Sequence, residues 1–411
     1  MKVSKDSKMH LKHFSPLLIC SLLSADELPD LLNQSQHESL NLELKKSDSE
    51  YNILRKSWIN PLNISYTHRK NGGDNAFDKT TSQTLSLNLN QDVFRSGGIY
   101  YAIEYAKKSN QLSQDLQALA KQGKIVQALN LVLQIAHNKI QIQKQNLLIK
   151  NSELDISVKR ELFLEGGLDV SILNRTLIEL NGYKNAHVEL KKMRVDLLTT
   201  FATISELDPY AVPPFNLKAI SVDEYLKHNL ALKAQNTKIL QEATFSKMTK
   251  ARFLPSITLS AGYNVKTTKA EDAFAKQIFG RDEAKSYDVG LTLNVPLNIS
   301  TFNEIEKSKL AHLISKNDAI LKKTEEKNLY FAAQHKIAML QEKKLIAKEN
   351  VTLYSDLLAQ IKEQLDAGIK TEQDYQMMKN TLDSSALDIA LYEIEERIEL
   401  LALLAKVDNE L

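Results

Sequence analysis

Apolar and polar residues alternate in two short stretches in each half of the chain. In the first half they are residues 62–68 and 84–90, and in the second half residues 256–266 and 287–295. Along 84–90, for example, leucine alternates with serine or asparagine. A period of two residues predicts strands with one apolar and one polar face. We therefore expect four amphipathic strands.

The second strand of each half is followed by a long helical pattern. Between Gly98 and Glu165 an apolar residue recurs at every seventh position: Leu112, Leu119, Val126, Leu133, Ile140, Leu147 and Leu154. A helix of this length would span roughly 100 Å. In the second half the apolar residues between Ala347 and Leu365 alternate spacings of four and three. Sustained heptads predict coiled-coil packing.

The order of elements occurs twice. Each half begins with a moderate helical stretch (26–58 and 221–253), continues with the two strands and the long helix, and ends with a glycine turn and a shorter return helix. A segment with three prolines separates the halves. We therefore divide the chain into a first structural repeat (26–205), a linker (206–220) and a second repeat (221–411).

Composition excludes several classes of protein. Only 12 glycines and 8 prolines predict few turns and long elements, and a formal net charge of +2 gives no attraction to nucleic acid. No phosphate-binding loop, dinucleotide fingerprint, zinc-protease motif or nucleophile elbow occurs. The nine histidines have no metal-ligand spacing. We expect neither an enzyme nor a cofactor or metal site.

The N-terminus has the pattern of an export signal. Four lysines precede a short apolar run, "FSPLLICSLL", and Ser24-Ala25 follows it. This predicts a signal peptide over residues 1–25, with a frayed N-terminal helix as the alternative. The single cysteine, Cys20, lies in the run, so the mature chain would have no disulfide. Acylation of Cys20 is a second alternative. No other apolar run is long enough for a transmembrane helix.

Four amphipathic strands cannot form a finished sheet in lipid. An open sheet leaves edge N–H and C=O groups unpaired, and closed membrane barrels begin at about eight strands. A symmetric ring of chains must therefore close the sheet, and three chains would supply twelve strands with room for a lumen. A soluble β-sandwich is the alternative on periodicity alone. The export signal and the paired long helices favour the membrane.

The doubled order of elements, the junctions "LNLNQDVFRSGG" and "LTLNVPLNIS" and the two glycine turns resemble the TolC-like outer-membrane efflux proteins over nearly the whole mature chain. Ser300-Thr301 depart from the pattern, since a glycine pair is usual there. The resemblance implies a mixed α/β membrane protein. Four amphipathic β-strands per chain would complete a trimeric 12-strand outer-membrane β-barrel, continued by a long coiled-coil α-helical barrel in the periplasm.

The resemblance also implies a function. A homotrimer in the cell outer membrane would conduct substrates passively to the exterior, opened by a periplasmic adaptor protein and energised by an inner-membrane transporter. The compact length, ending at "AKVDNEL", is similar to the metal-resistance branch, so heavy-metal ions are one expected cargo. A type I secretion exit duct is an alternative. A periplasmic adaptor with coiled-coil hairpins is another, although it needs one hairpin and no membrane strands.

The resemblance places a periplasmic gate near the second glycine turn. Asp374, six residues after Gly368, matches an acidic residue that points into the pore in the family, and Lys370 and Glu372 are expected to join inter-chain charge pairs. A solvated helix acid is the alternative reading of Asp374. The family's next acidic position is Met377 here. In the first repeat Leu173 would be the equivalent of Asp374, so the two repeats would differ at the gate.

Two more groups of residues follow from the resemblance. The tips Gly167-Leu168 and Gly368-Ile369 are similar to the turns that meet the adaptor, while plain helix caps are the alternative. Aromatic residues near the strand ends would form interfacial girdles. Trp58 is the leading candidate for such a girdle, with a packed position under the barrel rim as its alternative.

Overall fold

The computed structural model of the protein describes residues 31–72, 80–212, 215, 217–270 and 281–408. The expected signal peptide (1–25) and Cys20 lie outside these residues.

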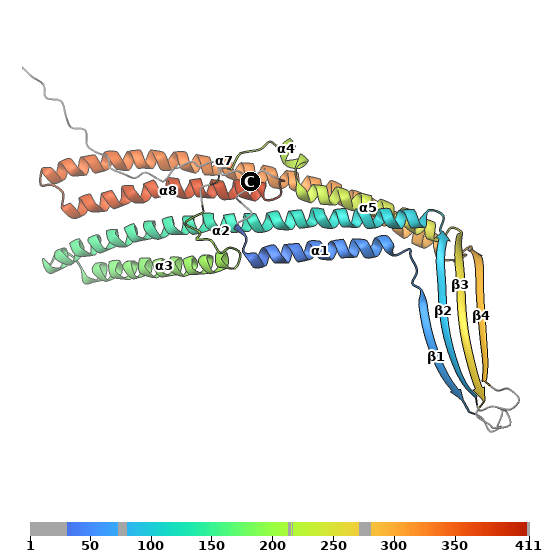
Figure 1. The fold of residues 1–411 in the computed structure, drawn as a ribbon. Coiled ribbons are helices and arrows are strands. Elements are labelled where there is room, and N and C mark those ends of the chain that lie inside the picture. The colour runs from blue at the N-terminus through green and yellow to red at the C-terminus, as the bar shows by residue number, and fades with distance from the viewer. Residues whose placement is uncertain (1–30, 73–79, 213–214, 216, 271–280, 409–411) are drawn as a thin grey trace, which may run out of the picture. The chain divides into compact units, whose positions relative to one another are not determined.

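The first half of the chain contains a helix, a hairpin, a long helix and a return helix (Figure 1). Their bounds are α1 Gln34–Lys56, β1 Asn63–Asn71, β2 Thr80–Phe94, α2 Gly98–Leu164 and α3 Val170–Ala202. The second half follows the same order with α4 Val222–Lys227, α5 Leu230–Arg252, β3 Ser256–Ala270, β4 Arg281–Asn294, α7 Thr301–Asp366 and α8 Glu372–Leu404. The repeat bounds 26–205 and 221–411 and the linker 206–220 stay a prediction.

The prediction of one helical stretch over residues 221–253 is wrong, because the structure divides this segment into α4 and α5. Asn229 lies between them, and its side chain accepts a hydrogen bond from the Leu232 N–H (3.1 Å), which caps α5. The Asn229 amide also donates to the buried Glu326 carboxylate (3.3 Å). An asparagine with non-helical dihedrals and two partners ends one helix and begins the next.

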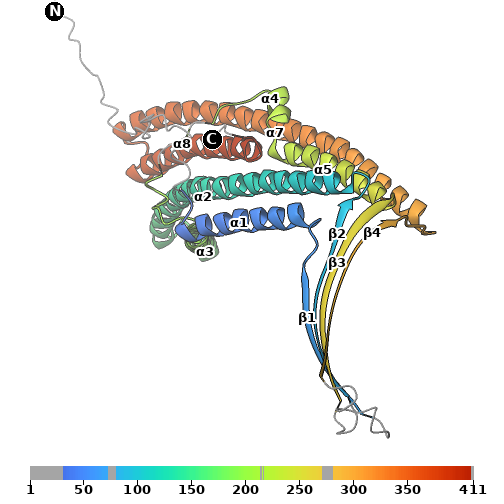
Figure 2. The same cartoon turned by 45° about the vertical axis from the view of Figure 1, so that its right-hand side comes forward.

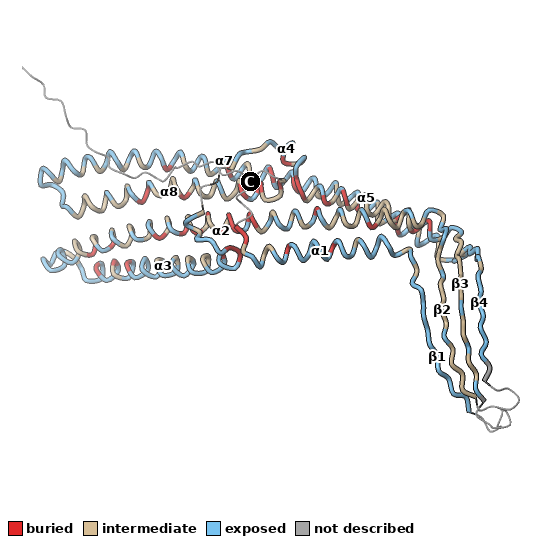
Figure 3. The backbone as a smooth tube through the Cα atoms, viewed as in Figure 1, coloured by how far each residue is buried: buried red, intermediate tan, exposed pale blue. Residues whose placement is uncertain are grey.

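The four described strands form one antiparallel sheet in the order β1-β2-β3-β4. They are longer than the alternating patterns, and they curve along their length (Figure 2). The strand ends at Asn71, Thr80, Ala270 and Arg281 lie together at the end of the sheet opposite to the ends joined to helices (Figure 1). No described strand side chain is buried (Figure 3). The sheet therefore has no core of its own on either face.

The chain divides into two compact units. The strand unit contains Glu38–Lys121 and Leu226–Asn328, and the helical unit contains Met1–His37, Gln122–Tyr225 and Leu329–Leu411. Each unit takes segments from both halves of the sequence, and α2 and α7 contribute residues to both units.

In the helical unit, four helices lie side by side in the order α3-α2-α8-α7. The neighbouring pairs are joined by contacts such as Asn138–Leu190, Lys144–Asp388 and Lys344–Glu396. In the strand unit the order is α1-α2-α5-α7, with the contacts Ser47–Asn110, Asp115–Thr237 and Gln235–Ser315. Each row is one layer thick, as the sheet is. A single layer buries little apolar surface unless something covers it.

The predicted heptad row of α2 is only partly buried. Of its seven members, Val126 and Leu133 are buried in the isolated chain and the others are half-buried. A second row of the same period is buried more uniformly, with Ala128, Ile135, Ile142 and Ile156 among its members. The helix has two neighbours in the helical unit, so it buries more than one stripe.

Candidate functional site

The register of the sheet separates an apolar face from a polar face. Rows of paired residues on one face include Ile64–Leu87–Tyr263–Tyr287 and Leu89–Ala261–Val289. The alternate rows include Ser65–Ser86–Asn264–Ser286 and Asp92–Thr258–Thr292. Side chains of neighbouring strands in the same row point to the same side. The expected alternation is therefore continuous across all four strands.

The apolar face forms a band that remains open to solvent in the single chain. Along β3 it extends from Ile257 to Val265, about 27 Å at 3.4 Å per residue. A tilt of about 40° would reduce its height to about 21 Å, close to the roughly 25 Å apolar belt of membrane barrels. Leu291 of this band is 72% exposed. Tyr66, Tyr263 and Tyr287 lie near the loop end of the band, as interfacial aromatic residues do.

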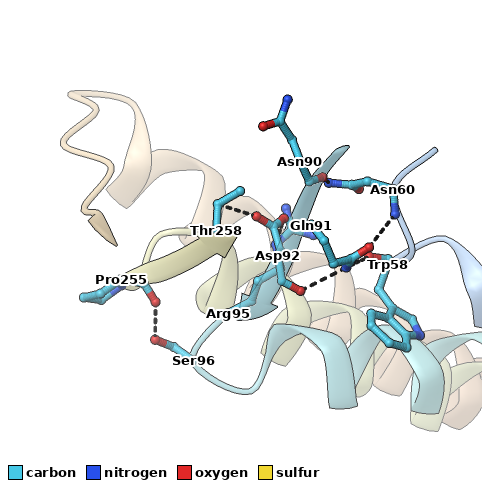
Figure 4. Close-up of polar contacts among 9 residues, drawn as sticks. All are labelled: Trp58, Asn60, Asn90, Gln91, Asp92, Arg95, Ser96, Pro255 and Thr258. Atoms are coloured by element: carbon cyan, nitrogen blue, oxygen red, sulfur yellow. Dashed lines mark hydrogen bonds and ion pairs between the residues drawn. The ribbon is translucent and has the colours of Figure 1, made fainter. Parts of the chain in front are cut away.

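The junction between strands and helices is fixed by polar contacts (Figure 4). The Gln91 amide donates to the Trp58 carbonyl (2.9 Å) and accepts from the Asn60 N–H (3.0 Å), which ties the chain before β1 to the end of β2. Asp92 accepts from the Thr258 hydroxyl (2.6 Å) and pairs with Arg95 (3.1 Å). These contacts set the direction in which β2 leaves the sheet.

The turn from β2 into α2 contains unusual backbone. Ser96 and Gly97 both have positive φ, 47° and 83°. A non-glycine residue in this region is strained, and here the Ser96 hydroxyl donates to the Pro255 carbonyl (2.6 Å), which holds it in place (Figure 4). The glycine pair of the sequence motif is thus one part of a junction that also uses the proline before β3. Trp58 is half-buried beside it, and its role in an aromatic girdle stays a prediction.

The two helix tips have the same turn geometry. Gly166 and Gly368 have positive φ (77° and 73°). The Gly166 N–H donates to Phe163 O (3.0 Å) and the Gly167 N–H to Leu162 O (2.9 Å). The equivalent bonds of the second tip end at Leu365 and Gln364, at 2.9 and 2.8 Å. Both tips are therefore helix C-caps of the Schellman type.

This geometry corrects the alignment of the two repeats. The equivalent of Gly368 is Gly166, because both have positive φ, and not Gly167. The N-caps of the return helices, Asp169 and Thr371, have the same spacing from these glycines. The equivalent of Asp374 is then Ile172 instead of Leu173, which is buried. The sequence is ambiguous here because the first turn contains two adjacent glycines.

The structure describes all seven predicted site residues at these tips. Ile369 is 73% exposed and Leu168 is half-buried, while Gly167 and Gly368 lie in the turns themselves. Glu372 begins α8 and accepts a hydrogen bond from Gln376 (2.7 Å). Lys370 lies in the turn, with its ammonium 3.9 Å from a carboxylate oxygen of Asp374.

Asp374 has a structural role that we did not predict, although Thr371-x-x-Asp374 has the spacing of a capping box. It occupies the third position of α8 and forms a capping box with Thr371. Its carboxylate accepts from the Thr371 N–H (3.1 Å) and hydroxyl (3.0 Å). The Thr371 backbone hydrogen bond is the main cause that lowers the pKa of Asp374, opposed by partial burial and assisted by the Thr371 hydroxyl and Lys370. The Asp374 side chain is 38% exposed, and its carboxylate is ionised at neutral pH.

A ladder of polar contacts joins α2 to α8 within the helical unit, and sequence reasoning missed it. Its pairs are His137–Glu395 (3.1 Å), Lys144–Asp388 and Asn151–Thr381 (3.1 Å). Each step of seven residues along α2 matches a step of seven back along α8, as expected for antiparallel helices in contact. The heptad spacing of these polar residues was the available signal.

Among the described residues, no helix is long and apolar enough to cross a membrane, and no group of three or more His, Cys, Asp or Glu side chains is placed to hold a metal ion.

The edges of the two helical rows also carry apolar side chains. On α7 they include Leu313, Ile320, Met339 and Leu353, on α3 Ile178, Val188 and Val195, and on α1 Leu42 and Ile53, all of them exposed. Charged and polar residues would be expected at such edges if water were their permanent surroundings.

No family model matches the chain, and a search of curated proteins gives no match by sequence. Solved structures do match. The CmeC outer membrane channel of Campylobacter jejuni superposes with a TM-score of 0.71 at 15% identity, over 93% of this chain and 84% of that one. The open state of the MtrE outer membrane channel of Neisseria gonorrhoeae gives 0.67 at 13% identity, over 92% and 88%. The fold is that of the TolC-like channels.

CusC, a protein whose structures describe transmembrane channel formation, also has this fold, with a TM-score of 0.68 at 10% identity over 92% of this chain and 90% of CusC. The expected resemblance to the TolC-like proteins is thereby confirmed at the level of the fold. The chain spans most of the length of each of these structures.

Proposed function

We propose that three copies of the chain form a channel in the cell outer membrane, with the helical part in the periplasm. The observation that carries this proposal is that the sheet and both helical rows are single layers with two open edges. The sheet ends at β1 and β4. The helical row of the strand unit ends at α1 and α7, and the row of the helical unit ends at α3 and α7. Single layers of this kind are completed by closure into a ring.

Three chains account for the exposed apolar surface. Twelve strands would close the sheet, with the apolar band toward lipid and the polar rows around a water-filled lumen. The row edges would meet those of the neighbouring chains, which would cover residues such as Leu313 and Ile178. The alternation of the strands supports this orientation, because only one face of the sheet is compatible with lipid.

As an exit duct of a tripartite efflux system, the channel conducts passively. A periplasmic adaptor protein opens it, and an inner-membrane transporter supplies the transport energy; the likeness of the fold to outer membrane channels supports this role. An acidic gate favours cations, heavy-metal ions among them. The alternative function is that of a type I secretion exit duct, whose cargo would be a secreted protein. A periplasmic adaptor is less well supported, because the strands and the two hairpins all match channel structures.

The gate of this channel is proposed at the second tip. Three copies of Asp374 would lie near the axis with Lys370 and Glu372 beside them, and their charges would add in a narrow passage. The tips Gly167-Leu168 and Gly368-Ile369 would contact the adaptor. Ile369 supports this assignment, since an exposed apolar residue next to a rigid turn is suited to docking.

The two faces of β4 give a matched test of the barrel. Leu291→Arg places a charge toward lipid and should cost about 2–4 kcal/mol if it is near the midplane. Thr292→Arg, one residue further on, faces the lumen and should still allow assembly. The measurement is the fraction of intact trimer in detergent, by mass of the complex. Equal loss in both variants, or a wild-type protein that is a detergent-free soluble monomer, would refute the barrel.

The gate is tested with conservative changes of charge. Asp374→Asn retains an oxygen that can accept the Thr371 hydrogen bonds, so trimer yield should be unchanged while cation selectivity in planar bilayers falls. Asp366→Asn, at the end of α7 and without a predicted place in the pore, is the control. If both variants shift the reversal potential equally, the assignment of the gate to Asp374 is wrong.

A further inference from the structure

Beyond the apolar band, the same face of the sheet becomes basic. Lys285 of β4 is the register partner of Val265, the last apolar residue of the band on β3. Two rows closer to the hairpin loops, Lys70 and Lys269 are both register partners of Thr81, so they share one row. All three lysines have the strand parity of the apolar face. We call Lys70, Lys269 and Lys285 the basic rim.

The basic rim has an excess of positive charge. Among the described side chains at this end of the apolar face, the only acid is Glu283, which pairs with Lys285 at 3.3 Å. The side chain of Lys285 is 62% exposed in spite of this pair, and Lys269 is also exposed. Lys269 and Lys285 outnumber this one acid, so the described side chains of β3 and β4 leave a positive surface at the edge of the apolar band.

The order of residues along the strands matches the order of layers in a membrane. Along β4, Leu291 and Val289 come first, Tyr287 follows and Lys285 comes last, while along β3 Val265 lies between Tyr263 and Lys269. Acyl chains, the interface and phosphate groups follow each other in the same sequence with depth. Lysine side chains at this level can extend along the surface and place their ammonium groups among phosphates.

We propose that the basic rim binds the phosphate groups of lipid headgroups in the leaflet on the side of the hairpin loops. This inference rests on the proposed function, which places the apolar face in lipid and the loops at the exterior. Three chains would carry three such rims around the barrel. Bound headgroup phosphates would anchor the channel at a fixed depth.

The alternation of the strands supplies a matched control. Arg69 is adjacent to Lys70 and Lys266 lies three residues before Lys269, but both have the parity of the polar face. They would face the lumen, so they carry the same charge at the same depth without access to lipid. If lipid binding falls when two charges are removed from the apolar face, but not when two are removed from the polar face, the lipid phosphates are bound by the basic rim and not merely attracted by the net charge of the protein.

The experiment measures binding of lipid A, a diphosphorylated lipid, to the purified full-length trimer in neutral detergent by mass of the intact complex. The wild type should bind lipid A and should bind its dephosphorylated form and phosphatidylcholine much less. The double variant K269Q/K285Q should lose roughly tenfold or more in apparent affinity, at about a factor of five per lysine. The variant R69Q/K266Q should stay within about twofold of the wild type.

Two results would overturn the inference while leaving the channel intact: equal losses in the two double variants, or wild-type binding that is indifferent to the phosphates of lipid A. In both cases the trimer and its conductance would be normal. A wild-type chain that forms no trimer would instead refute the proposed function, and the basic rim would fall with it.

Discussion

The two helical hairpins of the chain, α2-α3 and α7-α8, have the same turn but differ in the packing of their ends. Between residues 152 and 180 of the first hairpin, five residues are buried: Ser152, Ile156, Leu173, Thr176 and Leu180. In the equivalent stretch of the second, residues 354–382, none is buried in the single chain. The first tip thus has a small core, formed by Ile156, Leu173 and Leu180 with Ile149 and Leu177 against it.

The hairpins also differ in the chemistry that joins their helices. In the first, Asn138 and Gln145 donate to backbone carbonyls of α3 (3.1 and 2.9 Å). In the second, Lys336 pairs with Glu399 (3.1 Å) and Lys344 with Glu396 (3.0 Å). The first hairpin also has an exposed ion pair, Lys184–Glu153 (3.2 Å), so the ion pairs alone do not distinguish the two hairpins. The difference is the buried apolar cluster, which only the first tip has in the single chain. The second hairpin is therefore the one whose tip opens at lower cost.

The largest expected difference concerns Leu173 and its equivalent Tyr375. Leu173→Ala removes a buried side chain from the first tip and should lower its free energy of local opening by about 2–5 kcal/mol. Tyr375→Ala, at a half-buried position, should cost less than about half of that. Hydrogen exchange of amides in 152–180 and 354–382 measures both. Similar costs at the two positions would mean that, in the assembled protein, the two tips have similar free energies of local opening, and the difference in burial in the single chain does not decide which tip opens.

The next effect concerns the caps of the return helices. Thr371→Ala removes the hydroxyl from the capping box and should cost about 1 kcal/mol, seen as faster exchange at the start of α8, and Thr371→Ser should restore the cap. Because Asp374 keeps its charge in Thr371→Ala, cation selectivity should be retained. Loss of selectivity in this variant would show that the cap, and not the charge alone, positions the gate.

A smaller effect is expected at the ladder between α2 and α8. Asp388→Ala breaks the pair with the half-buried Lys144 and should destabilise the contact by about 0.5–1 kcal/mol. The exchanged pair, Lys144→Asp with Asp388→Lys, should recover most of the loss. A double-mutant cycle read by hydrogen exchange in α8 gives the coupling energy. A coupling near zero would show that the ladder does not contribute to docking of the second hairpin.

The smallest effect is that of pH, and it concerns both tips. Hydrogen bonds from Ser171 lower the pKa of Asp169, and the Thr371 N–H chiefly lowers that of Asp374, both from 3.8. A carboxylate with a lowered folded pKa contributes its full stability above the unfolded pKa and loses it as pH falls through the folded pKa. Hydrogen exchange at the two tips of the single chain should therefore be constant between about pH 5 and 8 and change only below about pH 4. A midpoint of tip exchange above pH 5 in the single chain would contradict these hydrogen bonds, whereas in the proposed trimer the three Asp374 carboxylates would repel one another and move the midpoint of selectivity upward.

The sequence by itself determined the elements that depend on local backbone geometry. The two faces of the strands follow from the alternation at 84–90 and its three counterparts, and the end of α7 at Asp366 follows from Gly368. Side-chain alternation in a strand and the left-handed preference of glycine are properties of a few consecutive residues. For the same reason the long helix after Gly98 was predictable almost to its last residue.

Only the tertiary structure decided which distant residues meet. The adjacent glycines at 166 and 167 left the register of the first tip open by one residue, and the dihedral angle of Gly166 settled it. The ladder pairs Lys144 with Asp388 across 244 positions, and the break at Asn229 depends on a buried Glu326. Such contacts depend on how helices pack side by side, and the pattern within one helix cannot specify the register of its neighbour.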